Sequence, residues 1–227
     1  MKTTHLFILT SVVAGLTQPL TAATQTSELN AAERLTIDGG RQVVREENIK
    51  NSAWPRVSIQ QFVEATPEEA AAVFTDYERQ STYIPGVKKS VISRRVAPAV
   101  TEVDYILSVP LFPDEDYTVR DSVSTYNGGA SYRVDWTKVR ARSTKDIVGS
   151  ARFDPYRNLR TEKDGTLITY VNFVAPGQFL AGPLKGRAVK QVKKTVIAVV
   201  KQIEVGRSSA RALLASQIAA LVTALAG

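Results

Sequence analysis

The sequence predicts an α+β fold in which an antiparallel sheet of about six strands has one apolar face and a long C-terminal helix covers that face. Apolar and polar residues alternate between Val87 and Ala175, with turn residues between the runs, as is typical of short antiparallel strands. The apolar period then becomes helical beyond residue 187. Because a sheet with one apolar face must pack against another element, this helix is expected to be its cover.

The first strand of the domain, at residues 57–63, is followed by two short helices. Thr66 stands at an N-cap position and Pro67 at the first helical position, with glutamates in the first turn, and each of these residues is favoured where a helix begins. A second helical segment is expected to end at Tyr83. The Ile-Pro-Gly turn at residues 84–86 closes it.

Alternation then defines a series of short strands, and the Asn-Gly-Gly sequence at residues 127–129 predicts a hairpin turn between two of them. These strands are expected at residues 103–109, 117–123, 132–136, 147–153 and 167–174.

The long helix has two chemically different sides. Its apolar side carries Val189, Val192, Val196, Val199, Val200 and Ile203. Its opposite side carries Arg187, Lys190, Lys194 and Lys201. This pattern is typical of a helix that buries one face against a domain.

Residues 1–23 have the pattern of a secretory signal peptide. Lys2 precedes a mostly apolar run over residues 6–16, and small residues occupy the positions before a cleavage site after Ala23. The apolar run is shorter than the ~20 residues that a membrane-spanning helix needs. We therefore expect a periplasmic or secreted protein.

The rest of the chain divides into three parts. Residues 24–53 form a polar N-terminal extension with a possible strand at 41–49, residues 54–206 form the domain, and residues 207–227 form an amphipathic tail without charge from Ala212 onward. Docking on the domain, self-association and contact with a membrane are all open for this tail. Its helical apolar stripe consists of Leu214, Ile218, Leu221 and Leu225.

Composition excludes several kinds of chemistry. The chain has 227 residues, a formal net charge of +7, no cysteine and one histidine, His5, which lies in the segment expected to be removed. A Ser-His-Asp triad, a Cys-His pair and a zinc site of histidine or cysteine are therefore excluded from the mature chain. We assign no catalytic residue, metal or cofactor, and the composition favours binding over catalysis.

Five segments match a known family: Glu64-Ala65-Thr66-Pro67-Glu68-Glu69, residues 73–78, residues 83–87, residues 166–170 and Ala175-Pro176. Together with the order of the elements, these segments resemble the START-like (Bet v 1-like, SRPBCC) superfamily, and within it the polyketide cyclase and coenzyme Q-binding START branch. The resemblance covers roughly residues 54–205. It implies a helix-grip fold, in which a curved antiparallel sheet wraps around the C-terminal helix, and a hydrophobic cavity between them. Members bind or carry lipids, sterols, quinones and other apolar molecules, and some are polyketide cyclases or dehydratases.

Because the resemblance implies a cavity, the inward-facing residues are the candidate ligand contacts, although a filled core would use the same side chains. Asp121 is the exception in chemistry, because it interrupts an apolar strand face. It is either a polar anchor for the ligand, or the mark of a bulge or of a salt bridge to an arginine. The candidates are Tyr105, Leu107, Val119, Asp121, Val134, Trp136, Val171, Phe173, Phe179, Leu184, Val192 and Val196.

Three other motifs are weaker. Residues 175–186 have the glycine spacing of a phosphate loop but lack its lysine and hydroxyl residue, so we interpret them as the loop that enters the long helix, with Phe179 and Leu180 near the cavity mouth. The acidic run at residues 114–116 is interpreted as a solvated loop. Dispersed basic residues are expected to be solvated or to meet anionic lipid headgroups, and no motif for nucleic acid accompanies them.

Three functions are compatible with the sequence. The first is an exported binding or transfer protein for a hydrophobic small molecule, such as a lipid or quinone, held between the sheet and the C-terminal helix. The second is an enzyme that resembles polyketide cyclases or dehydratases and uses Tyr, Asp or Arg in the pocket. The third is an interaction module of the cell envelope that uses the tail. Contact with a membrane surface would involve the basic residues, the loop at residues 179–180 or the tail.

Overall fold

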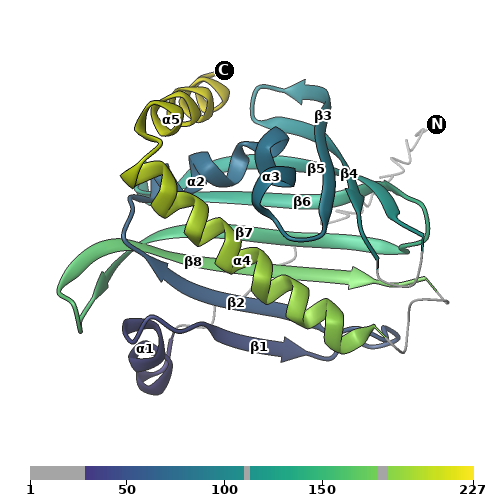
Figure 1. Ribbon diagram of the computed structural model, residues 1–227, viewed down its shortest axis with the longest axis horizontal. Coiled ribbons are helices and arrows are strands. Elements are labelled where there is room, and N and C mark those ends of the chain that lie inside the picture. The colour runs from purple at the N-terminus through teal and green to yellow at the C-terminus, as the bar shows by residue number, and fades with distance from the viewer. Residues whose placement is uncertain (1–28, 110–112, 178–183) are drawn as a thin grey trace, which may run out of the picture.

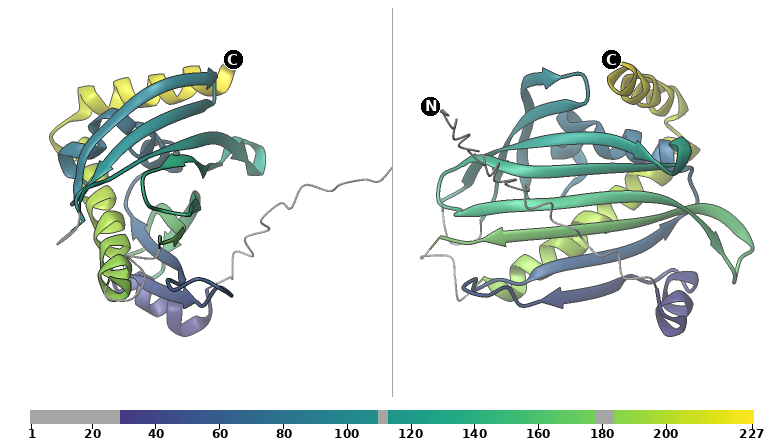
Figure 2. Two further views of the ribbon diagram at one scale, coloured as in Figure 1. Left: turned by 90° about the vertical axis from the view of Figure 1, so that its right-hand side faces the viewer. Right: turned by 180° about the vertical axis from the view of Figure 1, so that it is seen from behind.

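A curved antiparallel sheet carries a long helix near the C-terminus on its concave face (Figures 1 and 2). In the computed structural model, which describes residues 29–109, 113–177 and 184–227, eight strands pair in the order β1-β2-β8-β7-β6-β5-β4-β3. Helix α4 crosses the concave face, and α2, α3 and α5 lie at one end of it. The helix-grip fold that the resemblance implies is therefore confirmed.

The strands are β1 (Val43–Glu47), β2 (Arg56–Val63), β3 (Val87–Ala97), β4 (Val100–Leu107), β5 (Glu115–Tyr126), β6 (Ser131–Ala141), β7 (Asp146–Asn158) and β8 (Lys163–Ala175). The helices are α1 (Ala31–Asp38), α2 (Pro67–Thr75), α3 (Gln80–Tyr83), α4 (Lys185–Ser208) and α5 (Arg211–Ala226), with 3-10 turns η1 (Tyr77–Arg79) and η2 (Asn127–Gly129).

The expectation of about six strands was too low, and β3 is the main reason. This strand is largely exposed, and its register against β4 shifts three times. Each shift moves the following side chains relative to the faces of the sheet. The residues of β3 therefore show no clear alternation from which a strand could be recognised.

Helix α2 begins where its cap predicts. The Thr66 hydroxyl accepts a hydrogen bond from the Glu69 amide at 3.1 Å, and the Glu69 carboxylate accepts one from the Thr66 amide at 2.8 Å. Three alanines, residues 70–72, are fully buried. Because they are small, α2 lies close to the sheet and fills that part of the concave face.

Helices α4 and α5 close the core from the C-terminal side. Val199, Val200 and Ile203 of α4 and Leu214 and Leu221 of α5 are buried in the main core. Of the three possibilities for the tail, the structure shows docking: α5 packs against α2 and α4. Within the described ranges, no single helix has both the length and the hydropathy to cross a bilayer. Helices α4 and α5 reach that length and hydropathy only when they are taken together, and the pair is bent by 113° at its break.

The N-terminal extension contains a helix that the sequence interpretation missed. Helix α1 begins at a capping box formed by Asn30 and Glu33. Asn30-x-x-Glu33 has the sequence spacing of that motif, so the signal was available in a stretch interpreted as polar with one strand. The strand expected at residues 41–49 is the shorter β1, which pairs with β2 at the edge of the sheet.

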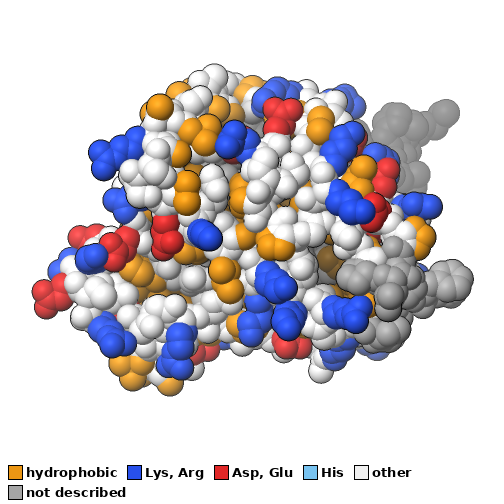
Figure 3. Space-filling model, in the orientation of Figure 1, with side chains coloured by type: hydrophobic (Ala, Val, Ile, Leu, Met, Phe, Trp, Pro, Cys, Tyr) orange, Lys and Arg blue, Asp and Glu red, His pale blue; other side chains and the backbone are white. Residues whose placement is uncertain are grey.

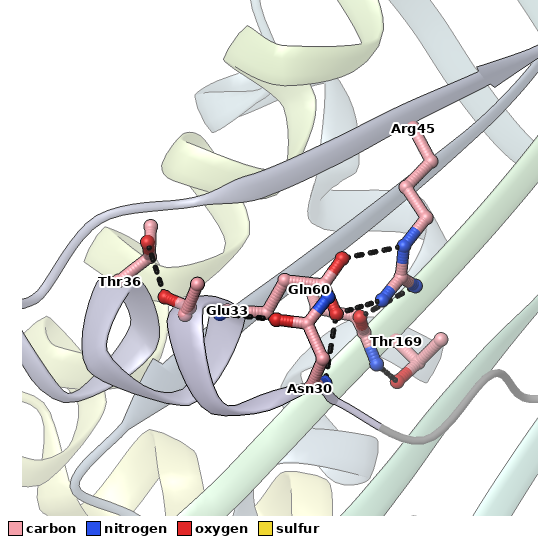
Figure 4. A network of polar contacts seen from close by, with 7 residues as sticks. Asn30, Glu33, Thr36, Arg45, Gln60 and Thr169 are labelled. Carbon is pink, nitrogen blue, oxygen red and sulfur yellow. Dashed lines mark hydrogen bonds and ion pairs between the residues drawn. The ribbon is translucent and has the colours of Figure 1, made fainter.

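A polar network joins α1 to the sheet (Figure 4). The Arg45 guanidinium of β1 forms an ion pair with Glu33 at 2.7 Å and donates to the Gln60 side chain of β2 at 2.9 Å. Gln60 donates in turn to the Thr169 hydroxyl of β8. The network therefore connects the extension to two strands of the main sheet.

Gly149 of β7 makes room for the indole of Trp136. A Cβ at Gly149 would lie 2.3 Å from the Trp136 ring and 2.5 Å from a backbone oxygen of β8. The indole N–H donates to the Asn172 side chain of β8 at 3.4 Å. The ring therefore lies across β7 and forms part of the floor of the concave face.

We expect Gly149→Ala to lower the free energy of unfolding by about 1–3 kcal/mol, the usual cost of overpacking. Gly186→Ala is the matched control, because open space surrounds Gly186 in α4; it should leave stability unchanged or raise it by up to ~1 kcal/mol. Urea unfolding of both variants measures this, and a Gly149→Ala protein as stable as the parent would contradict the packing described.

Candidate functional site: an apolar cavity under the long helix

A cavity of about 520 Å³ lies between the concave face of the sheet and α4. This volume falls in the ~300–1,000 Å³ range of small-molecule pockets. Most of the surface that lines it is apolar, and its walls include residues from α2, α3, α4 and seven of the eight strands described. The cavity is the part of the concave face that neither α2 nor α4 fills with side chains.

Seven of the twelve candidate residues line this cavity: Tyr105, Leu107, Val119, Asp121, Trp136, Leu184 and Val192. Val134 and Val196 are buried in packed clusters and do not line it. Phe179 lies outside the described residues.

Val171 and Phe173 were assigned to the wrong face of β8. Tyr170, Asn172 and Val174 line the cavity instead, and side chains of a strand alternate between faces. The run Leu-Ile-Thr-Tyr-Val-Asn-Phe-Val is apolar on both sides, so its alternation does not reveal which face is inward. Asn172 is polar and nevertheless faces inward, where its amide oxygen accepts a hydrogen bond from the Trp136 N–H.

The sequence interpretation also omitted several lining residues from its candidate set. Tyr117 shares the inward parity of Val119 and Asp121, so the strand pattern could have identified it. Gln80 could not be recognised in this way, because a polar residue in a short helix gives no burial signal. Lining residues outside the candidate set include Phe74, Gln80, Tyr117, Ile147, Tyr170 and Asn172.

Asp121 is a buried carboxylic acid in the cavity wall. Its exposed fraction is 4%, and its Oδ2 atom is fully buried. Asp121 forms no hydrogen bond or ion pair with any residue that the structure describes. Asp121 pairs in regular register with Thr101 and Trp136, so neither a bulge nor a salt bridge to an arginine explains it. Burial raises the pKa of Asp121 to about 8.

A hydrogen-bonded chain fixes one wall of the cavity. The Tyr105 hydroxyl donates to the Gln80 side-chain oxygen at 2.8 Å, and the Gln80 amide donates to the Phe74 carbonyl at 2.8 Å. Tyr105 also stacks on Tyr117, with ring centroids 5.3 Å apart. Burial, and secondarily the charge of nearby Asp121, raises the pKa of Tyr105 well above its ordinary value.

Glu115 corrects the expectation of a solvated acidic loop at residues 114–116. Its side chain is buried and lines the cavity, and it accepts hydrogen bonds from the backbone amides of Ser143 and Thr144 at 3.0 and 2.9 Å and from the Ser143 hydroxyl. Burial by itself would raise the pKa of Glu115, but these hydrogen bonds outweigh it and hold the pKa below the ordinary value. Glu115 is therefore a structural carboxylate, and Asp114 and Asp116 form surface ion pairs.

The rim of the cavity on α4 is basic. Arg187, Lys190 and Lys194 line the rim, and Lys185 and Lys193 lie in the same half of the helix. Figure 3 shows this cluster of blue side chains over the N-terminal half of α4. None of the five forms an ion pair with a described residue, and α4 contains no acidic residue before Glu204. The positive charge at the rim is therefore uncompensated by side chains of this region.

The fold and the cavity define a class of protein built around an apolar pocket. Comparisons of this chain with known protein families and solved structures point to the same class. The family model described as polyketide cyclase / dehydrase and lipid transport matches residues 55–204. The chain belongs to this family, and its assignment to the START-like superfamily is thereby confirmed. A comparison with curated proteins found no match.

Three solved structures illustrate the shared fold. A STAR-related lipid transfer protein from Xanthomonas axonopodis superposes with a TM-score of 0.60 at 16% identity, over 72% of this chain and 92% of that one. Human STARD10 gives a TM-score of 0.54 at 17% identity, over 75% of this chain and 74% of that one. The Zhui aromatase/cyclase from Streptomyces gives 0.50 at 15% identity, over 68% and 96%. At these identities the similarity establishes the fold.

The raised pKa of Asp121 predicts an unusual dependence of stability on pH. The pKa of Asp121 in the folded state, about 8, lies above its ordinary value of 3.8. The folded protein therefore binds the extra proton, and its stability falls as pH rises from about 4 to 8, by up to ~1.4 kcal/mol per pH unit. Asp121→Asn removes this loss. We expect the unfolding free energy of Asp121→Asn, measured relative to that of the parent, to increase by on the order of 2–4 kcal/mol between pH 5 and pH 8.

Urea unfolding of the parent and the Asp121→Asn variant at both pH values measures this difference. Other titrating groups are common to the two proteins and cancel in the comparison. An advantage of equal size at pH 5 and pH 8 would show that Asp121 is ionised, or solvated, in the folded state.

Proposed function

We propose that the protein binds a hydrophobic small molecule, such as a lipid or quinone, between the sheet and α4, and carries it rather than transforming it. The apolar cavity carries this proposal. Burying apolar ligand surface is favourable by roughly 25 cal/mol per Å², and the cavity walls offer few polar partners that a water-soluble ligand would need. The family's description, which includes lipid transport, supports the same function.

We further propose that the protein acts outside the cytoplasm. The signal pattern in residues 1–23 supports export, with removal of the segment after Ala23. The mass of the protein isolated from its host would test this step: a chain that begins at Thr24 is expected, and an intact N-terminus on a cytoplasmic protein would contradict it.

The basic rim on α4 supports contact with an anionic membrane surface, from which the ligand would be loaded or to which it would be delivered. Each basic residue near such a surface contributes about 1 kcal/mol. Three of the five cations described above line the cavity, so binding to the membrane through them would place the cavity next to the lipid.

A second candidate function is cyclisation or dehydration of a carbonyl-containing chain, and Asp121 is the observation that favours it. A carboxyl group with a pKa of about 8 can exchange a proton near neutral pH, as a general acid or base does. Product formation from a poly-β-carbonyl substrate that is lost in Asp121→Asn would favour this role over transport.

We expect Val192→Trp to weaken the binding of the neutral apolar dye N-phenyl-1-naphthylamine by about tenfold or more, because the indole would occupy part of the cavity. Val192 lines the cavity, and a tenfold loss corresponds to ~1.4 kcal/mol. Fluorescence titration of the dye measures the effect.

Ile197→Trp is the matched control for this substitution. Ile197 lies on the same helix but is 51% exposed, so its replacement should leave dye binding within about twofold of the parent. Equal dye affinity in the Val192 variant and the parent would place the binding site elsewhere.

Reversing one charge at the rim should weaken binding to vesicles that contain phosphatidylglycerol. We expect about a fivefold loss or more for Lys190→Glu, from ~1 kcal/mol per charge near the surface, and a smaller loss for Lys201→Glu, which is exposed on the same helix but does not line the cavity. Sedimentation with vesicles at low and high salt measures this. Equal losses in the two variants would indicate general charge attraction rather than docking at the rim.

A further inference from the structure

The cavity contains one feature that transport of a purely apolar molecule does not need. Asp121 places a carboxyl group, 4% exposed, in a mostly apolar wall. An unpaired buried polar group costs on the order of 1–3 kcal/mol, and more when it is charged. Most buried polar groups in proteins therefore have partners, and this one requires a physical explanation.

The groups that surround Asp121 do not supply a partner. Four tyrosines lie close enough for the Asp121 charge to raise their pKa values: Tyr77 of η1, Tyr105 of β4, Tyr117 of β5 and Tyr170 of β8. Asp121 hydrogen-bonds to none of them. Arg95 of β3 influences Tyr77 and forms no ion pair with Asp121.

Two other pairs of polar groups in this part of the cavity already have partners. The Trp136 N–H donates to Asn172, and the Tyr105 hydroxyl donates to Gln80. Among the described residues, the fully buried side-chain atoms left without a hydrogen bond are the Tyr77 hydroxyl oxygen and Oδ2 of Asp121. Of these two residues, Asp121 lines the cavity, so its unused hydrogen-bonding capacity is available to a ligand.

We propose that Asp121 is the polar subsite of the cavity and selects a ligand whose buried end carries an uncharged oxygen function, a hydroxyl or a carbonyl, on an apolar body. This proposal rests on the proposed transport function. A protonated carboxyl group donates through its O–H and accepts through its carbonyl oxygen, so it pairs with either function. With no cation beside it, Asp121 keeps its proton at neutral pH, and it would repel a ligand carboxylate if it lost that proton.

Two substitutions separate this role from a merely structural one. Asp121→Asn retains one donor and one acceptor in nearly the same shape, whereas Asp121→Leu removes both and keeps a side chain of similar size. The probes are decan-1-ol, decan-2-one and decylammonium, and each is compared with the neutral dye in the same protein at pH 6.5.

We expect the parent and Asp121→Asn to bind decan-1-ol and decan-2-one with similar selectivity relative to the dye. Asp121→Leu should lose about tenfold of that selectivity, the equivalent of ~1.4 kcal/mol. Unchanged selectivity in Asp121→Leu would overturn the proposal, as would a parent that prefers decylammonium and loses this preference in Asp121→Asn. If the parent binds neither the dye nor any probe, the proposed transport function itself fails.

The same proteins give an independent readout in their pH profiles. Above about pH 8 the parent should lose affinity for decan-2-one, because an ionised Asp121 cannot donate to a carbonyl oxygen. The Asp121→Asn profile should stay flat up to pH 9, since burial raises the pKa values of the four tyrosines above 10 and they remain protonated. Parallel profiles in the two proteins would overturn the assignment.

Discussion

The structure depends on how a curved sheet with one apolar face is covered. Eight strands spaced ~4.8 Å apart span roughly 34 Å, whereas one helix with its side chains is about 10–12 Å wide. Helix α4 therefore cannot cover the concave face alone. Helix α2, with its buried alanines, and α5 fill one end of it, and the uncovered remainder is the cavity of about 520 Å³.

The polar groups in that remainder follow from the same constraint. Where the helices leave space, a polar side chain needs a neighbour within hydrogen-bonding reach. Trp136 has one in Asn172, across β7, and Tyr105 has one in Gln80 of α3. Asp121 has no such neighbour. A carboxyl group in this position destabilises the folded chain when it is ionised, which connects the hydrogen bond proposed for the ligand to the pH dependence of stability.

The sequence identifies those parts of the fold that have local causes. The Thr66 cap, the alternation of β4 to β6 and the apolar stripe of α4 are each determined by neighbouring residues. The face of β8 is not, because that strand is apolar on both sides, and the bulges of β3 remove its alternation. The cavity itself is a property of long-range packing, so residue patterns alone could not distinguish it from a filled core, and the burial of Glu115 depends on the turn at Ser143 that it meets in the folded chain.

Native mass spectrometry of the protein purified from its own host is the most direct test of ligand carriage. We expect a complex heavier than the polypeptide by the mass of one small molecule. On denaturation, that molecule should be released as an apolar compound with a hydroxyl or carbonyl group. A bare polypeptide mass, together with no uptake of an added apolar alcohol or ketone, would show that the cavity does not hold such a ligand.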